Sequence, residues 1–269
     1  MLVTSVPASR APVDPGWVAE HVARDGFATV HDVITGNELD QLRAMVDAAV
    51  EADAELAPIE RRDEARGRVL FLPQHDRGFL DLLARPELVE PCEAILGSDC
   101  TVFTMTTSCL PPGSSGLAMH RDMRVHAPGF IVGVGVLLLL DDVDDLSGTT
   151  RFYPRRVPEQ PSPEDFASSA VHLSGPAGSV CWFDGSVWHD VPPNRSDRPR
   201  RVAILAFIRP WMRPRFDIPR MLAHLEPTSF PAAVAAKLGF GHLLPGSTEE
   251  YYLPADERRA RLLERALEP

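Results

Sequence analysis

Phe130-Ile-Val-Gly-Val-Gly-Val-Leu-Leu-Leu-Leu140 is a near-continuous apolar stretch in the middle of the 269-residue chain, and it decides the fold class. Valine recurs at every second position, at Val132, Val134 and Val136, as is typical of a strand buried within a sheet. The run from Ile131 to Leu140 is too short to span a bilayer as a helix, which takes about 20 residues. We therefore expect a central strand of a globular protein.

Segments on both sides of this stretch extend the pattern. Further strands are predicted over 26–31, 101–110, 179–183 and 202–208. Turns rich in Pro, Gly and Asp, such as Pro111-Pro-Gly113 and 141–145, separate them. Helical spacing is predicted over 16–24, 39–50, 78–83, 86–96 and from about 231 to 267. Helices, then many strands, then helices indicate a mainly β fold with flanking helices, built on an antiparallel sandwich or jelly roll.

The same order predicts one folded domain. We expect a flexible N-terminal tail over 1–15 and a single domain over 16–269, without an internal repeat. Within it we expect a helical N-terminal part (16–97), a jelly-roll core (98–215) and a C-terminal helical extension (216–269).

Charge and cysteine content narrow the classes of partner. The formal net charge of −11 disfavours nucleic acid or an anionic membrane and leaves a small molecule as the expected partner. The four cysteines form no Cys-x-x-Cys pair, and no basic region followed by an apolar stretch opens the chain. We expect a cytoplasmic protein. Oligomeric state is not readable.

One spaced set of residues carries the chemistry: His120-Arg-Asp122, then His189, then Arg200. Two histidines and one carboxylate can hold a single iron on one face and leave three positions open. One residue separates His120 from Asp122, which puts both side chains on the same face of an extended strand. Arg200 follows His189 by eleven residues and offers a fixed cation for a carboxylate. The combination suggests oxygen chemistry driven by a 2-oxo acid.

Each part of this set also has a plainer interpretation. His-x-Asp alone is a weak motif, and either histidine could be an ordinary loop residue. Arg200 could be a surface side chain of the basic turn over 195–201. If Arg200 faces inward, Arg201 should project to the opposite face. Asn194 and Ser196 are expected to shape the turn.

The motifs together resemble the phytanoyl-CoA dioxygenase family of iron(II)/2-oxoglutarate oxygenases. The similarity covers about residues 17–215. The stretches that carry it are Arg24-Asp-Gly-Phe-Ala-Thr-Val30, Leu110-Pro-Pro-Gly113 before His120-Arg-Asp122, Leu140-Asp-Asp-Val143, Gly148-Thr-Thr-Arg-Phe-Tyr-Pro154 and Trp188-His-Asp-Val-Pro-Pro-Asn-Arg-Ser-Asp-Arg-Pro-Arg200. One stretch departs from the family pattern, because Arg155-Arg-Val157 stands where glycine-serine-histidine is usual.

The resemblance implies a fold and a ligand set. The fold would be a double-stranded β-helix, the cupin-like jelly roll. His120, Asp122 and His189 would be the catalytic iron ligands, and Arg200 would bind the distal carboxylate of 2-oxoglutarate. Thr150 and Thr107 are further candidates for contact with this co-substrate, although which face of its strand Thr107 takes is open.

The resemblance also implies a reaction. The protein would be an Fe(II)- and 2-oxoglutarate-dependent dioxygenase that uses O2, releases succinate and CO2, and most simply hydroxylates an unactivated C–H bond. Halogenating relatives carry a small residue in place of Asp122, so a carboxylate here favours hydroxylation, or a related desaturation, cyclisation or epimerisation. A small organic metabolite, in secondary-metabolite biosynthesis, is the expected substrate.

Two other classes stay open. One is a metalloenzyme of the same cupin-type fold that does not use 2-oxoglutarate, and the other is a non-catalytic small-molecule-binding module. Substrate contacts are less readable still. Arginines 61, 62, 66 and 68 suggest a lid but are more typical of a solvated face, and 209–214 and 238–242 are candidates for the pocket entrance. His126, His172 and His242 are expected to be structural or exposed.

Overall fold

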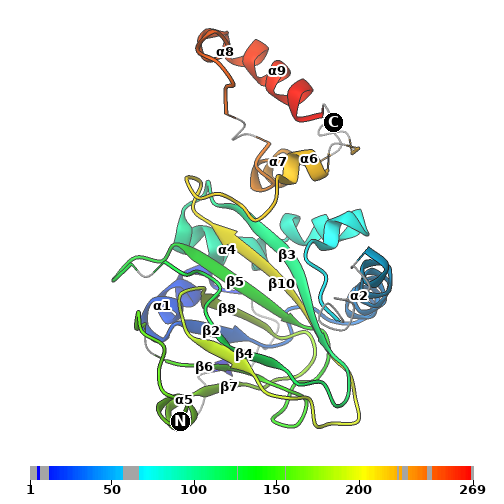
Figure 1. The fold of residues 1–269 in the computed structure, drawn as a ribbon, viewed down its shortest axis with the longest axis vertical. Helices are drawn as coiled ribbons and strands as arrows, with labels where there is room; N and C mark the ends of the chain where they lie inside the picture. Colours follow the sequence, from blue (N-terminus) through cyan, green and yellow to red (C-terminus); the bar gives the residue numbers. More distant parts are fainter. Residues whose placement is uncertain are drawn as a thin grey trace.

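Two antiparallel β-sheets form the centre of the protein in the computed structural model (Figure 1). The structure describes residues 5–6, 12–56, 67–125, 127–154, 156–222, 224–225, 230–240 and 244–267. The larger sheet has the strand order β1-β2-β8-β5-β10-β3. Its strands are β1 (Ser5–Val6), β2 (Phe27–Val30), β8 (Val180–Asp184), β5 (Gly133–Leu139), β10 (Arg200–Ile208) and β3 (Thr101–Leu110). Only the short β1–β2 pair of this sheet is parallel among the described strands.

The smaller sheet has the strand order β4-β9-β6-β7. Its strands are β4 (Leu117–His120), β9 (His189–Val191), β6 (Thr150–Phe152) and β7 (Val171–Leu173). Side chains from the inner faces of both sheets pack into one apolar cluster. Phe183 of β8 contacts Phe152 of β6 with ring centroids 5.2 Å apart, and Leu137 and Leu173 belong to the same cluster. The two sheets therefore face each other, as in a jelly roll.

The outer face of the larger sheet is covered by helices. Val136, Leu138 and Trp182 point to this side and pack with residues of the N-terminal helices in the largest apolar cluster. These helices are α1 (Pro15–Asp25), α2 (Asn37–Leu56), the 3-10 helices η2 (Leu72–Gln74) and η3 (Arg77–Ala84), and α4 (Pro86–Leu96). Burial on both faces explains why the central strands are apolar at successive positions rather than alternating.

The rest of the helices are short or lie at the end of the chain. They are α5 (Pro163–Ser169), α6 (Ile218–Met221), α7 (Ala232–Lys237), α8 (Thr248–Tyr252) and α9 (Ala255–Leu267). Figure 1 shows α8 and α9, in orange and red, projecting away from the sheets. Among the described residues, no helix is long and apolar enough to cross a membrane.

The predicted fold class is confirmed: the protein is mainly β with flanking helices and a two-sheet core. The segment 78–83, predicted as an ordinary helix, lies within the 3-10 helix η3. The expected N-terminal tail lies largely outside the described residues, although Ser5–Val6 pair with β2 and α1 begins at Pro15. The division of 16–269 into three parts stays a prediction.

Candidate metal centre

The two histidines of the predicted set meet across neighbouring strands. β4 and β9 pair antiparallel in the smaller sheet, and His120 lies directly opposite His189 in their register. Asp122 follows β4, where the backbone N–H of Met123 donates to the carbonyl of Gly185 at 2.7 Å. Strand pairing, together with this hydrogen bond, brings His189 beside His120 and Asp122, which lie about 70 residues earlier in the chain.

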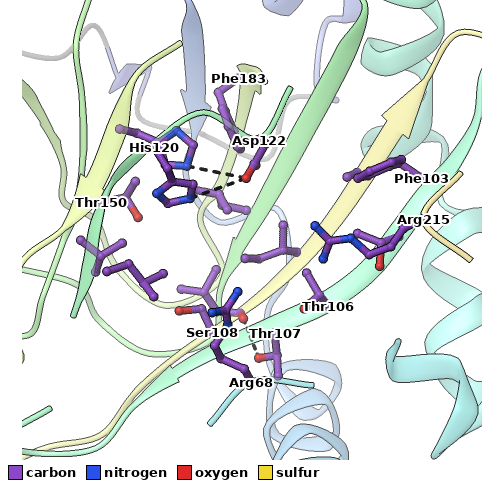
Figure 2. A pocket seen from close by; sticks show the side chains of 18 of the residues that line it. Arg68, Phe103, Thr106, Thr107, Ser108, His120, Asp122, Thr150, Phe183 and Arg215 are labelled. Carbon is purple, nitrogen blue, oxygen red and sulfur yellow. Dashed lines mark hydrogen bonds and ion pairs between the residues drawn. The ribbon is translucent and has the colours of Figure 1, made fainter. Parts of the chain in front are cut away.

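The ligand atoms of the three side chains lie close enough to hold one ion. Figure 2 shows His120 beside Asp122. The Asp122 Oδ1 atom lies 3.7 Å from Nε2 of His120 and 4.0 Å from Nε2 of His189. Ligand atoms of all three residues lie within 4.8 Å of one another. His189 is buried, whereas the side chains of His120 and Asp122 are 39% and 35% exposed, so one side of the centre opens to the cavity.

Backbone carbonyls determine which ring nitrogen each histidine offers. Nδ1 of His120 lies 2.8 Å from the carbonyl oxygen of Ala118, and Nδ1 of His189 lies 3.0 Å from that of Val187. A carbonyl can only accept, so each Nδ1 carries the proton and each Nε2 presents its lone pair towards Asp122. Burial lowers the pKa of His189, which favours the neutral imidazole that a metal requires. Two imidazoles and one carboxylate are the donor set of non-haem iron(II) sites, so the residues fit that ion.

Arg200 opens β10 and enters the space between the sheets. Only 1% of it is exposed, its Nη2 donates to the Thr150 hydroxyl at 2.9 Å, and its Nη1 lies 3.4 Å from that of Ser108. Its Nε has no hydrogen-bond partner, and no ion pair with Arg200 occurs within the described ranges. Burial lowers the pKa of its guanidinium to about 10, which still leaves it charged at neutral pH. A buried cation without an anion is costly, and this one lines the same cavity as the metal ligands.

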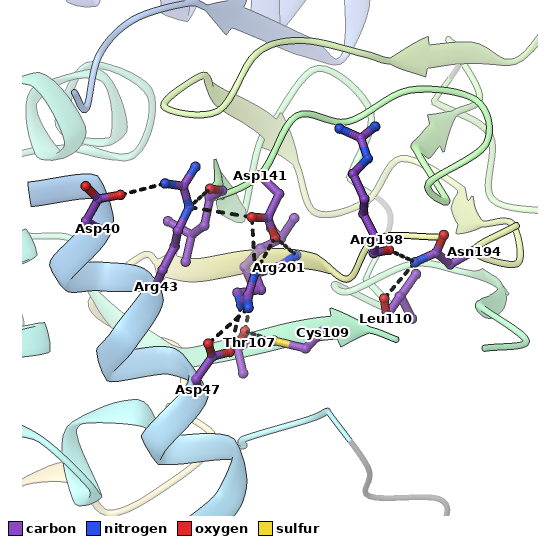
Figure 3. Close-up of polar contacts among 12 residues, drawn as sticks. Asp40, Arg43, Asp47, Thr107, Cys109, Leu110, Asp141, Asn194, Arg198 and Arg201 are labelled. Atoms are coloured by element: carbon purple, nitrogen blue, oxygen red, sulfur yellow. Dashed lines mark hydrogen bonds and ion pairs between the residues drawn. The ribbon is translucent and has the colours of Figure 1, made fainter. Parts of the chain in front are cut away.

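The neighbouring Arg201 projects to the opposite face, as predicted (Figure 3). It binds Asp47 of α2 and Asp141, with N–O distances of 2.7–3.1 Å. Asn194 is fully buried, and its amide donates to the carbonyls of Leu110 and Arg198 at 2.8 Å each. The buried Asn194 side chain therefore holds the loop from His189 to Arg200 and fixes where Arg200 enters the sheet.

Thr150 and Thr107, the two predicted co-substrate contacts, are placed differently. The Thr150 hydroxyl accepts from Arg200, whereas the Thr107 hydroxyl donates to the carbonyl of Val202 at 2.7 Å and lies 3.4 Å from Cys109 Sγ. Although Thr107 borders the cavity, the β3 side chain within hydrogen-bonding distance of Arg200 is that of Ser108. The sequence analysis did not single out Ser108.

The cavity also contains two arginines that sequence reasoning did not assign to it. Val202, Ile204 and Ala206 form an apolar wall at every second position of β10, and Arg68 and Arg215 line the same space. Arg68 had been grouped with a solvated face, and Arg215 lies one residue beyond the expected entrance segment. The related expectations for Arg61, Arg62, Arg66, His126 and His242 fall outside the described residues.

Two remaining side chains have structural partners. Trp188 donates from Nε1 to the carbonyl of Val157 at 3.1 Å, and Arg121 stacks over its ring at 4.8 Å. His172 pairs with Asp145 at 2.6 Å on the surface.

Comparison with known proteins finds relatives in sequence and in fold. The uncharacterized protein Rv1501 of Mycobacterium tuberculosis is 25% identical over 248 residues, which cover 88% of this chain and 90% of that protein. Dioxygenase af480 of Aspergillus fumigatus is 24% identical over 206 residues, covering 72% and 67% of the two chains. The solved structure of the non-heme monooxygenase ThoJ in a nickel complex has a similar fold, with a TM-score of 0.58 at 20% identity over 74% of this chain and 80% of that one.

The resemblance read from the motifs is confirmed by a family model. The model described as phytanoyl-CoA dioxygenase (PhyH) matches residues 22–202, a span that contains every residue of the candidate site from His120 to Arg200. The chain belongs to the phytanoyl-CoA dioxygenase (PhyH) family.

Proposed function

We propose that the protein is an Fe(II)- and 2-oxoglutarate-dependent dioxygenase that hydroxylates a C–H bond of a small organic metabolite and releases succinate and CO2. Family membership and the names of its relatives support an oxygenase. The donor set of His120, Asp122 and His189 supports iron.

The observation that carries the 2-oxoglutarate part is the buried, unpaired guanidinium of Arg200. Its charge needs a carboxylate, the described residues supply none, and the cavity beside it opens on the metal ligands. A dicarboxylate could place one carboxylate on Arg200 and its other end at the metal. A two-point fork from guanidinium to carboxylate is among the strongest charge-assisted hydrogen bonds.

Each residue then has a defined task. His120, Asp122 and His189 hold the ion, and iron with 2-oxoglutarate and O2 supplies the oxidising power when bound. Arg200 and Thr150 hold the far end of the co-substrate and fix its direction. The apolar wall of Val202, Ile204 and Ala206 excludes water from the reacting end.

Binding of 2-oxoglutarate to wild-type protein and to Arg200→Gln tests the proposal, with Arg201→Gln as the matched control. We expect iron-loaded wild type to bind 2-oxoglutarate and to release succinate under O2. Arg200→Gln should lose at least about tenfold in affinity, because a charge-assisted fork is replaced by a neutral amide. Arg201→Gln should keep the wild-type affinity, since that side chain binds Asp47 and Asp141 on the other face.

The rival classes give different results. An enzyme of the same fold that does not use 2-oxoglutarate would bind iron but release no succinate. A non-catalytic module would consume no O2 in the presence of iron and 2-oxoglutarate. Equal affinities in the Arg200→Gln and Arg201→Gln variants would refute the role assigned to Arg200.

A further inference from the structure

The cavity carries more positive charge than the proposed reaction uses. Three arginines line it, Arg68, Arg200 and Arg215, against the one acid of the described lining, Asp122. A ferrous ion, Asp122, Arg200 and a 2-oxoglutarate dianion together have no net charge. Arg68 and Arg215 are then left over, in a chain whose formal net charge is −11. This step rests on the proposed function.

Arg215 is held in place but keeps its hydrogen-bonding edge. Its backbone N–H donates to the carbonyl of Phe103 at 3.0 Å, and its guanidinium lies over the Phe103 ring at 5.4 Å. A cation–π contact uses none of the N–H groups, and no hydrogen bond from this guanidinium to another described residue occurs, so its N–H groups are available for an oxyanion. Figure 2 shows Arg215 reaching towards the centre of the cavity.

Arg68 is positioned by the segment Gly67–Val69, here called the strap, which runs along the free edge of β3. The Gly67 carbonyl accepts from the N–H of Cys109 at 2.7 Å, and the Val69 carbonyl accepts from that of Thr107 at 3.1 Å. Gly67 has φ +77°, and an added Cβ would lie 2.2 Å from the Cys109 carbonyl oxygen. Val69 is buried in the helix-side core, so its neighbour Arg68 turns towards the cavity.

Neither side chain has an anionic partner. Within the described ranges no ion pair involves Arg68 or Arg215, although many other arginines, such as Arg85, Arg151 and Arg201, are paired with acids. The hydroxyls of Thr104 and Thr106 between them are engaged with the carbonyls of Leu70 and Val69. Both threonine hydroxyl protons are therefore already used, so the two arginines are the groups of this part of the cavity that can donate to an anion.

We propose that Arg68 and Arg215 form an oxyanion subsite, and that the substrate is an organic acid whose carboxylate or phosphate binds there while its apolar part lies along the β3–β10 wall towards the metal. An exposed guanidinium is screened by salt, so the subsite selects among substrates more than it adds raw affinity.

Matched probes that differ only in their head group test this proposal. Hexanoate, hexyl phosphate and hexanamide are titrated calorimetrically, without O2 and at low ionic strength, into iron-loaded full-length protein saturated with 2-oxoglutarate. At least one of the two anions should bind about tenfold more tightly than the neutral amide. Whichever anion binds better identifies the head group as a carboxylate or a phosphate.

Substitutions of single arginines test whether the anion preference depends on Arg68 and Arg215. Arg215→Gln and Arg68→Gln should each reduce the preference for the anion and leave hexanamide binding unchanged, and Arg215→Lys should restore part of it. Arg213→Gln is the control, because Arg213 is an exposed arginine of the same segment that does not line the cavity. The preference for anions over hexanamide is measured on the wild-type protein itself, so a variant that misfolds does not decide the outcome.

The design separates this inference from the proposed function. The same titrations are repeated with the Arg200→Gln variant. There the anion preference of the Arg68–Arg215 oxyanion subsite is measured whether or not 2-oxoglutarate binds. Loss of 2-oxoglutarate binding with the anion preference intact would count against the dioxygenase only. Equal binding of all three probes to wild type, or an equal loss in Arg213→Gln, would overturn the subsite.

Discussion

At the scale of single residues, hydrogen bonds decide which atoms are available. The carbonyls of Ala118 and Val187 fix the tautomers of His120 and His189, and the Thr150 hydroxyl directs one edge of Arg200. These partners are all local or cross-strand, so the fold itself orients both imidazoles and the guanidinium. Supporting hydrogen bonds of this kind hold candidate ligand side chains in a fixed orientation.

Asp122→Ala tests the ligand set. We expect metal affinity to fall by more than the roughly 10–100-fold typical of losing an outer partner, because a charged ligand is removed. Hydroxylation coupled to succinate should be lost with it. Metal titration and product analysis measure both, and unchanged coupled product formation would contradict the assignment.

Thr150→Val and Thr107→Val separate the two threonines. Thr150→Val should weaken 2-oxoglutarate binding about fivefold, equivalent to about 1 kcal/mol, since Arg200 loses the acceptor that orients it. Thr107→Val should leave that affinity unchanged, because its hydroxyl binds the Val202 carbonyl. Calorimetry on both variants gives the answer, and an equal loss in the two would show that Thr107 also supports the co-substrate.

The sequence allowed the candidate metal ligands to be predicted, but not all the residues that line the cavity. Spacing and family motifs pointed to His120, Asp122, His189 and Arg200, and the structure brings them to one cavity. The face of Thr107 could not be predicted, because β3 is buried on both sides and shows no polar–apolar alternation.

At the scale of elements, the β4–β9 pair sets the spacing of the ligands. Its register aligns His120 with His189, and Gly116 at its entrance lies against the Val191 carbonyl. Gly116 has φ +76°, and an added Cβ would come within 2.1 Å of that oxygen. Backbone contact this close leaves room for glycine alone.

Gly116→Ala should therefore shift β4 against β9, lower the free energy of unfolding and weaken metal binding. Gly113→Ala is the matched control. Gly113 has a similar φ of +80°, but nothing lies within 4 Å of an added Cβ. This variant should therefore show the cost of the backbone conformation without a steric clash. Urea unfolding and metal titration compare the two. Equal metal affinities would show that close packing at Gly116 does not set the ligand spacing.

A partly buried ion pair between Arg156 and Asp184 links the end of α1 to β8. Arg156 donates to Asp184 at 2.6 Å and to the carbonyls of Ala23 and Val22 at the end of α1. Asp184 is only 1% exposed. This arginine belongs to the stretch that departs from the family pattern, so the departure has a structural use here.

Arg156→Ala should lower the free energy of unfolding by about 1–3 kcal/mol, because the buried Asp184 carboxylate loses its cation and keeps only the Ser186 N–H. Arg24→Ala removes a nearby, exposed pair with Asp25 and should stay close to wild type. Urea denaturation of both variants checks this. A stable Arg156→Ala protein would mean that water or another group satisfies Asp184.

Local patterns predicted elements well and long-range partners poorly. Strand 101–110 and helix 86–96 have the predicted bounds, because periodicity and punctuating residues are local signals. Thr35-Gly-Asn-Glu38 has the spacing of a capping box before α2, but the Glu38 carboxylate pairs with Arg85, 47 residues away. The strap that places Arg68 likewise depends on contacts with β3 that local spacing does not encode.

At the scale of the whole molecule, two layers of packing have separate roles. The helix-side core fixes the larger sheet, and the inner core between the sheets positions the smaller one that carries the ligands. The space between the sheets holds the buried charge of Arg200. A bound anion should therefore stabilise this part of the protein most. Saturating 2-oxoglutarate at about 100 times its Kd should add about 2.7 kcal/mol of stability.

The charge-transfer absorption of iron chelated by 2-oxoglutarate, followed in an anaerobic titration, tests the central claim most directly. We expect the band to appear in wild type and in Arg201→Gln, and to require at least tenfold more 2-oxoglutarate in Arg200→Gln. Wild-type protein that binds iron stoichiometrically but develops no band at any 2-oxoglutarate concentration would contradict it.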